Sequence, residues 1–280
     1  MKIAISAEST IDIPVEMQKE FNIHTIPFTV LLGEKAGLDG DITPPEIFEY
    51  VAKNNILPKT SAINEYQYYE YFENLLKEYD YVIHFSLSSD LSSAYKNACS
   101  VAENLKNVTI IDSKSLSTGI ALLVLNACDL RDQGKTVEEI LESTRARLPY
   151  AQASFVVNTL DYLHKGGRCS GLTRLMALVF RIKPQIVVAD GKMKSTNKFT
   201  GKNESVVDKY AKAVFAEFKN PDLTRVFVTH SYADQSMVDV AVKACKERGF
   251  KQIYVTTAGA TITSHCGPKT LGILFINDNK

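Results

Sequence analysis

The fold of this chain is decided most clearly by residues 81–112, which read YVIHFSLSSDLSSAYKNACSVAENLKNVTIID. An apolar, strand-like run opens this stretch, and a serine-rich turn follows it directly. Apolar residues from Leu91 to Leu105 then recur every three or four positions, which is typical of one face of a helix. A second apolar run closes the stretch. This order predicts two parallel strands joined by a crossover helix.

The same alternation of strand and helix extends from this stretch to the N-terminus and to about residue 150. Residues 3–6 are apolar enough for a buried first strand. Thr43 precedes a pair of prolines and is expected to be the N-cap of a helix. Thr136 and Glu139 have the spacing of a capping box, which predicts another helix start. We therefore expect residues 1–150 to form an α/β domain whose mostly parallel sheet is flanked by helices.

After Leu148 and Pro149 the alternation starts again. Strand-like runs lie at 154–157, 225–229, 252–256 and 271–276, and an apolar helix is expected over residues 172–180. Asp190-Gly191 lies between two strand-like runs and predicts a tight β-hairpin. A hairpin among crossover connections requires antiparallel neighbours. We therefore expect residues 151–280 to form a second α/β domain with a mixed sheet.

The composition excludes several classes of protein. Lys+Arg and Asp+Glu are 32 each, so the formal net charge is zero, which argues against a nucleic-acid binder or a polybasic membrane-surface protein. No uncharged apolar run reaches the roughly 18 residues of a membrane helix. Five cysteines without CxxC spacing favour reduced thiols in the cytoplasm over a zinc site. We expect a cytoplasmic protein without a metal or cofactor and without stable membrane insertion.

Hydroxyl residues gather where the predicted strands end. α/β sheets bind their ligands at the carboxyl ends of strands. The phosphate-binding loop GxxxxGK[ST], the dinucleotide fingerprint GxGxxG, the zinc motif HExxH and the nucleophile elbow GxSxG are absent from the sequence. Each hydroxyl alone has a structural explanation, because Ser and Thr often cap helices at such positions. The clusters follow the strands at 3–6, 81–85 and 108–111 and recur before the last strand, where Thr261, Thr263 and Ser264 precede His265. His265 is expected in a loop, and Thr60-Ser61 in the loop before a tyrosine-rich helix.

Several motifs, in one order along the whole chain, resemble those of the DegV family of bacterial fatty-acid-binding proteins. The resembling stretches are Glu8–Asp12, Lys59–Ser61, Ser86–Tyr95, Asp112–Lys114, Leu160–Arg168 and His265–Pro268. The chain departs from the family pattern at Ala62–Asn64, at Ser93-Ala94 and at Lys269. These departures leave acyl-chain preference and kinase recognition open.

The resemblance implies a two-domain α/β carrier of one long-chain fatty acid such as palmitate or oleate. It also implies a partner, an ATP-dependent fatty acid kinase that phosphorylates the bound carboxylate, so the chain itself has no catalytic residue. By the same resemblance, the carboxylate ligands are Thr60, Ser61, Ser92 and His265, with Arg168 at the same mouth. We expect the acyl tail to lie in the second domain against Phe155, Val157, Leu172, Leu175, Met176, Leu178, Val179 and Phe180.

An enzyme is the alternative of a different class. Ser92 or Ser89 would act as a nucleophile, His265 as its base and Asp112 as the residue that orients the base, in a hydrolase or acyltransferase. These residue types suit such chemistry. However, the sequence contains neither a nucleophile elbow nor a recognisable oxyanion loop.

Overall fold

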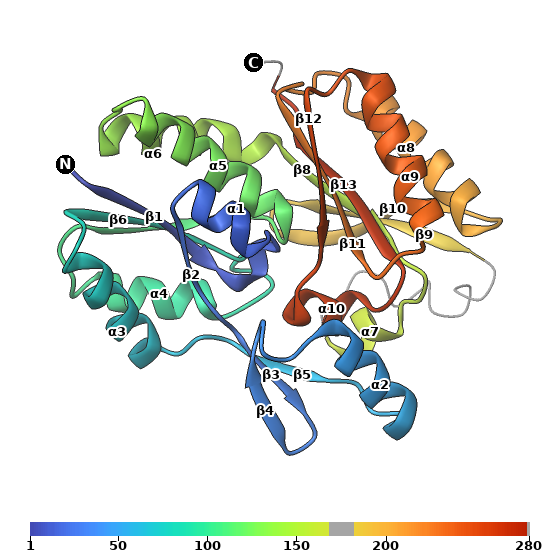
Figure 1. The fold of residues 1–280 in the computed structure, drawn as a ribbon, viewed down its shortest axis with the longest axis horizontal. Helices are drawn as coiled ribbons and strands as arrows, with labels where there is room; N and C mark the ends of the chain where they lie inside the picture. Colours follow the sequence, from blue (N-terminus) through green and yellow to red (C-terminus); the bar gives the residue numbers. More distant parts are fainter. Residues whose placement is uncertain (168–181, 279–280) are drawn as a thin grey trace.

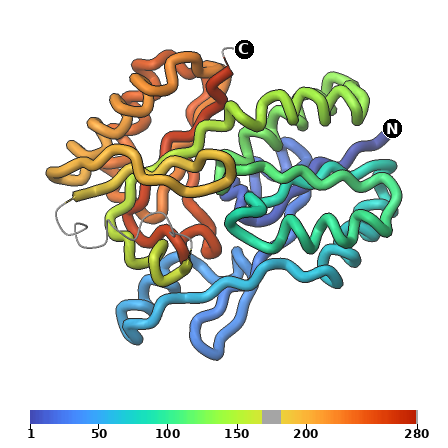
Figure 2. The backbone as a smooth tube through the Cα atoms, turned by 180° about the vertical axis from the view of Figure 1, so that it is seen from behind, coloured from blue at the N-terminus to red at the C-terminus, as the bar shows by residue number. Residues whose placement is uncertain are grey.

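A computed structural model describes residues 1–167 and 182–278, and its N-terminal half is built on a parallel sheet (Figure 1). The four strands have the order β2-β1-β6-β7, and every neighbouring pair is parallel. The strands are β1 (Ile3–Glu8), β2 (Ile23–Ile26), β6 (Tyr81–Ser86) and β7 (Val108–Asp112). The helices are α1 (Val15–Glu20), α3 (Glu65–Leu76), α4 (Ala94–Ala102), α5 (Thr118–Asp132) and α6 (Val137–Arg147). Figures 1 and 2 place α3 and α4 on one side of this sheet and α5 on the other.

The second half contains a six-stranded mixed sheet of order β10-β9-β8-β13-β11-β12. Its strands are β8 (Ala151–Val156), β9 (Lys183–Ala189), β10 (Lys192–Phe199), β11 (Arg225–Ser231), β12 (Gln252–Thr257) and β13 (Thr270–Ile276). The helices are α7 (Asp161–Lys165), α8 (Asn203–Glu217), α9 (Gln235–Arg248) and α10 (Ala260–Cys266). The parallel and mixed sheets expected from the sequence are thus confirmed. The predicted helix at 172–180 lies outside the described residues.

The hairpin at Asp190-Gly191 and the N-caps at Thr43 and Thr136 form as predicted. Asp190 and Gly191 both have positive φ, 52° and 79°, and join β9 to β10 in antiparallel pairing. Two positive φ values match the twist of a tight hairpin. Thr43 begins α2 (Pro44–Asn54), and the Thr136 hydroxyl accepts a hydrogen bond from the Glu139 amide.

A three-stranded antiparallel sheet lies apart from the two larger sheets and corrects one expectation. It consists of β3 (Thr29–Leu32), β4 (Lys35–Leu38) and β5 (Lys59–Ser61) in the order β4-β3-β5. Thr60 and Ser61 were expected in a loop, but they pair with Val30 and Thr29 of β3. The partner strand lies some thirty residues earlier, so no local pattern announces a strand of three residues.

The central strand β13 of the six-stranded sheet is buried on both faces, because its alternate residues enter different cores. On β13, Leu271, Ile273 and Phe275 pack in the cluster that contains the apolar residues of α8 and α9. Leu274 and Ile276 belong instead to the cluster that includes α5 and the parallel sheet. The strands of the parallel sheet all come before residue 150, and those of the six-stranded sheet all come after it. One apolar core nevertheless includes residues from both halves. The division into domains at residue 150 stays a prediction.

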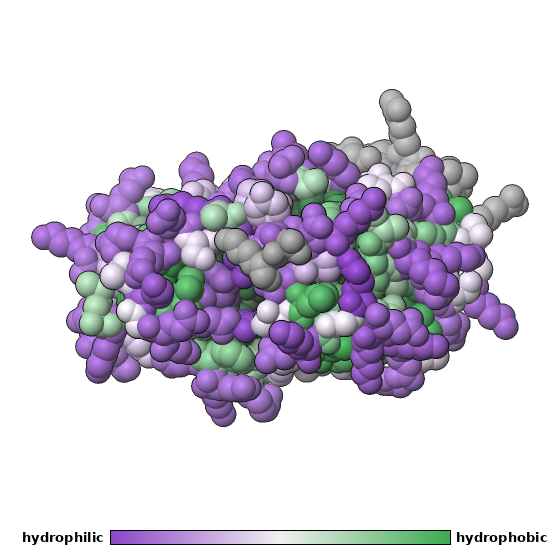
Figure 3. Space-filling view, turned by 90° about the horizontal axis from the view of Figure 1, so that it is seen from above, coloured by the Kyte–Doolittle hydropathy of each residue, from purple (hydrophilic) through white to green (hydrophobic). Residues whose placement is uncertain are grey.

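Polar side chains dominate one face of this layered structure and also join its two halves. Figure 3 shows mostly polar side chains on one face, with small apolar patches between them. Away from that surface, the Arg147 guanidinium at the end of α6 donates to Asp222, to Asp278 (2.7 Å) and to Asn126 (2.9 Å). Its side chain is 11% exposed. These contacts connect α5 and α6 to the segments before β11 and after β13.

We predict that Arg147→Met lowers the free energy of unfolding by about 3 kcal/mol. The substitution keeps most of the side-chain volume but leaves two largely buried carboxylates without their cation. Arg145→Met on the same helix removes an exposed arginine and is expected to change stability by less than about 0.5 kcal/mol. Urea unfolding of both variants measures the difference. Equal stabilities of the two variants would contradict a structural role for Arg147.

Candidate functional site

The loops that follow β1, β6 and β7 meet at one edge of the parallel sheet, as their hydroxyl clusters predict. The Ser88 amide donates to the Ser115 carbonyl oxygen over 3.1 Å, and the Ser113 amide donates to that of Ser86. The Ser117 hydroxyl donates to the Asp12 carboxylate of the first loop. The three loops are therefore cross-linked by hydrogen bonds before any ligand is considered.

A pocket beside this edge, which we call the hydroxyl pocket, is lined by six separate parts of the chain. In the described part of the chain its lining contains no Asp, Glu, Lys or Arg, so its polar groups there are hydroxyls, an imidazole and the backbone. The lining residues are Phe28, Thr60, Ser61, Ala62, Leu87, Leu91, Ser92, Ser93, Leu116, Met193, Thr261, Ile262 and His265. The proposed ligands Thr60, Ser61, Ser92 and His265 therefore line one pocket.

Thr60 and His265 are in direct contact across this pocket. The Thr60 hydroxyl and His265 Nε2 are 2.8 Å apart, which joins β5 to the C-terminal end of α10. His265 was expected in a loop, but it belongs to α10, a helix of seven residues. A helix this short is not stable by itself, which explains why its residues show no long periodic pattern in the sequence.

The first turn of α10 is held by two aspartate side chains from the N-terminal half. Asp12 accepts from the Gly259 amide and Asp39 from the Ala260 amide, each at 2.8 Å. These backbone groups have no partner within the helix, so side-chain acceptors must supply one. The position of His265 one turn later thus depends on residues far away in the sequence.

Two glycines of the recognised motifs make room for ring side chains next to His265. A Cβ atom on Gly166 would lie 2.7 Å from His265 Nδ1, and one on Gly267 would lie 2.7 Å from the Tyr162 ring. Gly267 also has a φ of 74°, which is unfavourable for residues with a Cβ. Both positions therefore require glycine for the local packing.

An apolar pocket adjoins the hydroxyl pocket. Leu116, Met193, Ile262 and His265 line both pockets, so the two share a wall. The lining of the apolar pocket is completed by Ser117, Phe155, Leu163, Thr229, His230, Ser231, Ala258, Cys266, Thr270, Gly272 and Leu274. Its volume is about 60 Å³, below that of a ~150 Å³ engineered cavity that binds benzene. A long hydrocarbon chain therefore enters only if the walls of this pocket move apart.

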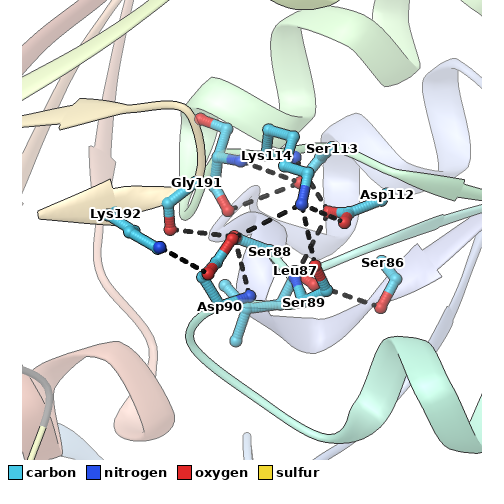
Figure 4. A network of polar contacts seen from close by, with 11 residues as sticks. Ser86, Leu87, Ser88, Ser89, Asp90, Asp112, Ser113, Lys114, Gly191 and Lys192 are labelled. Atoms are coloured by element: carbon cyan, nitrogen blue, oxygen red, sulfur yellow. Dashed lines mark hydrogen bonds and ion pairs between the residues drawn. The ribbon is translucent and has the colours of Figure 1, made fainter.

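The tip of the β9–β10 hairpin contacts the serine-rich turn (Figure 4). Met193, two residues after Gly191, lines the shared wall. The Ser88 hydroxyl donates to the Gly191 carbonyl oxygen over 2.9 Å, and Lys192 forms an ion pair with Asp90. A Cβ on Gly191 would lie 2.6 Å from the Ser88 hydroxyl oxygen, so the close approach requires glycine.

The remaining predicted residues lie in different places. The Ser92 hydroxyl accepts from the Ala94 amide at the start of α4, and the Ser61 hydroxyl donates to the Ala62 carbonyl oxygen. Phe155 lines the apolar pocket, whereas Val157 is buried in the core and is not among the residues that line it. Other predicted residues lie outside the described part of the chain: Arg168, Leu172, Leu175, Met176, Leu178, Val179 and Phe180.

The contacts of Asp112 within the described residues do not include His265, the base that Asp112 would orient in the enzyme alternative. Its carboxylate accepts from the Ser89 and Lys114 amides and pairs with the Lys114 ammonium at 2.8 Å (Figure 4). These bonds hold the pKa of Asp112 low although burial opposes them. Asp112 thus stabilises a turn. His265 Nε2 is in contact with the Thr60 hydroxyl.

Three residues of the shared wall, Leu116, Met193 and Ile262, were not predicted as ligand contacts. Single apolar residues in a loop, a strand or a short helix give no sequence signal for a pocket, because ordinary core residues have the same pattern. Among the described residues, no group of three or more His, Cys, Asp or Glu could hold a metal ion. Nor does that part of the chain contain a helix long and apolar enough to cross a membrane.

The two large sheets and their helices define a mixed α/β protein. Its hydroxyl pocket lies beside strand ends and is formed by residues from distant parts of the chain. Comparison with known proteins gives its relatives. Residues 2–278 match the family model described as "Uncharacterised protein, DegV family", so the chain belongs to the DegV family. The resemblance drawn from the ordered motifs is confirmed.

Three relatives illustrate the match. A DegV domain-containing protein of Caldanaerobacter subterraneus subsp. tengcongensis is 28% identical, with 98% of each chain covered. A fatty acid-binding protein of Thermotoga maritima is 25% identical, and the match covers 97% of this chain and 96% of that one. A solved structure, described as fatty acid binding of a DegV family protein from Thermus thermophilus, is 26% identical and has a TM-score of 0.90, with 99% and 100% covered.

We predict that Asp12 makes the stability of the protein depend on pH. Burial raises the pKa of Asp12 from 3.8 to about 8, although hydrogen bonds from Ser117 and Gly259 oppose the shift. The folded state therefore holds a proton that the unfolded chain releases, and stability falls as pH rises from about 4 to about 8.

Asp12→Asn removes this titration and keeps an oxygen acceptor for the Gly259 amide. Between pH 5 and 8 we expect the unfolding free energy of the wild type to fall faster than that of the variant, by at most about 1.4 kcal/mol per pH unit. Urea titrations at pH 5, 6, 7 and 8 measure both slopes. Parallel curves would show that Asp12 does not hold a proton in the folded protein.

Proposed function

We propose that this protein is a carrier that binds one long-chain fatty acid, with the carboxylate in the hydroxyl pocket and the tail in the adjoining apolar pocket. The observation that carries the proposal is the shared wall of Leu116, Met193, Ile262 and His265. A ligand that fits across this wall has a small polar head and an extended apolar tail.

The residues of the hydroxyl pocket suit a carboxylate head. Hydroxyl and imidazole N–H groups donate hydrogen bonds to an anion and compensate for part of its lost hydration. Donors without a full charge also leave the carboxylate oxygens available for reaction, which a bidentate guanidinium would hold more firmly. We assign Thr60, Ser61, Ser92 and His265 to the head group, with Arg168 at the same mouth by family resemblance.

The apolar tail supplies most of the affinity in this proposal. Burial of about 15 methylene groups contributes at most ~12 kcal/mol at ~0.8 kcal/mol each. Ordering of the ligand and separation of the pocket walls reduce this by several kcal/mol. The net affinity is still sufficient for a carrier that retains its ligand during purification.

Family membership supports the proposal, since relatives of this chain from Thermotoga maritima and Thermus thermophilus are described as fatty acid-binding. We further propose that the carrier acts in the cytoplasm as the non-catalytic subunit for a separate, ATP-dependent fatty acid kinase. The absence of a phosphate-binding loop in the sequence is consistent with this role.

Extraction of the purified protein tests the binding function. We expect organic solvent to release close to one long-chain fatty acid per protein, identified by mass spectrometry. Protein stripped of ligand is expected to take up added oleate or palmitate, which raises the melting temperature because the ligand binds only the folded state. If no fatty acid is extracted and neither acid binds, the proposal is wrong.

Head-group variants test how the ligand is presented. We expect Ser92→Ala and His265→Ala to slow phosphoryl transfer by the kinase at least tenfold while most of the acyl chain stays bound, because the tail contributes most of the affinity. Ser100→Ala, in α4 but not in the pocket lining, is the matched control. A Ser92/His265 double variant that is phosphorylated at the wild-type rate would refute these assignments.

A further inference from the structure

The helix that carries His265 has three other hydroxyl residues, and two of them have ordinary structural partners. The Ser264 hydroxyl donates to the Ala260 carbonyl oxygen one turn earlier, over 2.7 Å. The Thr263 hydroxyl contacts Ser231 at 3.1 Å and donates to the Ala258 carbonyl oxygen at 3.2 Å. Back-bonding of this kind is what Ser and Thr usually do in helices.

Thr261 differs from both neighbours. Its side chain lines the hydroxyl pocket, the residue is only 2% exposed, and its hydroxyl oxygen makes no hydrogen bond within the described part of the chain. Buried polar groups are nearly always paired, so such a group needs an explanation. The local geometry offers one, since the missing partner can come from the pocket.

The position of Thr261 on α10 fits a ligand contact. It lies four residues before His265, so the two side chains are on the same face of the helix, one turn apart. Both residues line the hydroxyl pocket. An anion held near His265 would therefore lie along the helix face that also presents Thr261.

From this geometry we infer that Thr261 is a further head-group ligand whose hydroxyl donates to the carboxylate of the bound fatty acid. The inference rests on the proposed fatty-acid function and extends its ligand set by one residue. A carboxylate accepts about four hydrogen bonds, so a donor from α10 can act beside those from β5 and the serine-rich turn. Binding of the acid would thereby satisfy a buried hydroxyl that has no partner among the described residues.

The test compares an acid with a neutral ligand of the same tail. Thr261→Val replaces the hydroxyl by a methyl group of similar size. We expect this variant to bind oleate about tenfold more weakly, the effect of losing one hydrogen bond to a charged group, and to bind methyl oleate as the wild type does. Thr261→Ser restores the hydroxyl and is expected to bring oleate affinity back to within about twofold of the wild type.

Ser264→Ala is the matched control on the same helix, because its hydroxyl bonds the helix backbone and does not line the pocket. We expect its oleate affinity to be unchanged. Wild-type affinity for oleate in a folded Thr261→Val protein, or an equal loss for oleate and methyl oleate, would overturn the inference. If the wild type itself binds neither ligand, the proposed function fails as well, and the two failures are distinguished by that measurement.

Discussion

The candidate site depends on the anchoring of one short helix at both ends by residues from the other half of the chain. Asp12 and Asp39 accept hydrogen bonds from the first turn of α10, and Thr60 contacts His265 at its last turn. Seven residues do not sustain a helix in water without tertiary contacts. The imidazole is therefore positioned by the packing of the two halves rather than by its neighbours in the sequence.

The shared core explains why the two halves hold this arrangement. Strands β8, β11 and β13 of the six-stranded sheet send alternate side chains into different clusters, and one of those clusters contains α5 and the parallel sheet. At the periphery, Arg147 and the hairpin tip at Gly191 add polar contacts between the same two parts. Close-packed interiors transmit small displacements, so a shift of one sheet would alter the pocket wall at Met193 and Ile262.

Local signals made part of this structure predictable from the sequence. The hairpin at Asp190-Gly191 and the capping box at Thr136 depend on residues next to one another, and both form as expected. Strand β5 and helix α10 were placed in loops, because their partners lie far away in the chain. The ordered family motifs brought Thr60 and His265 forward as candidates together. The close contact between them follows from tertiary packing, which local patterns do not encode.

The long separation between Thr60 and His265 in the sequence has a consequence for folding during synthesis. The two residues are 205 positions apart, and the hydrogen bond between them completes the pocket. While the ribosome makes the chain from its N-terminus, domains fold as units in the order of their synthesis. The parallel sheet can assemble early, but the imidazole joins it only after the 205 residues beyond Thr60 have been made. A nascent or truncated chain that lacks α10 therefore exposes the serine-rich turn and has no complete hydroxyl pocket.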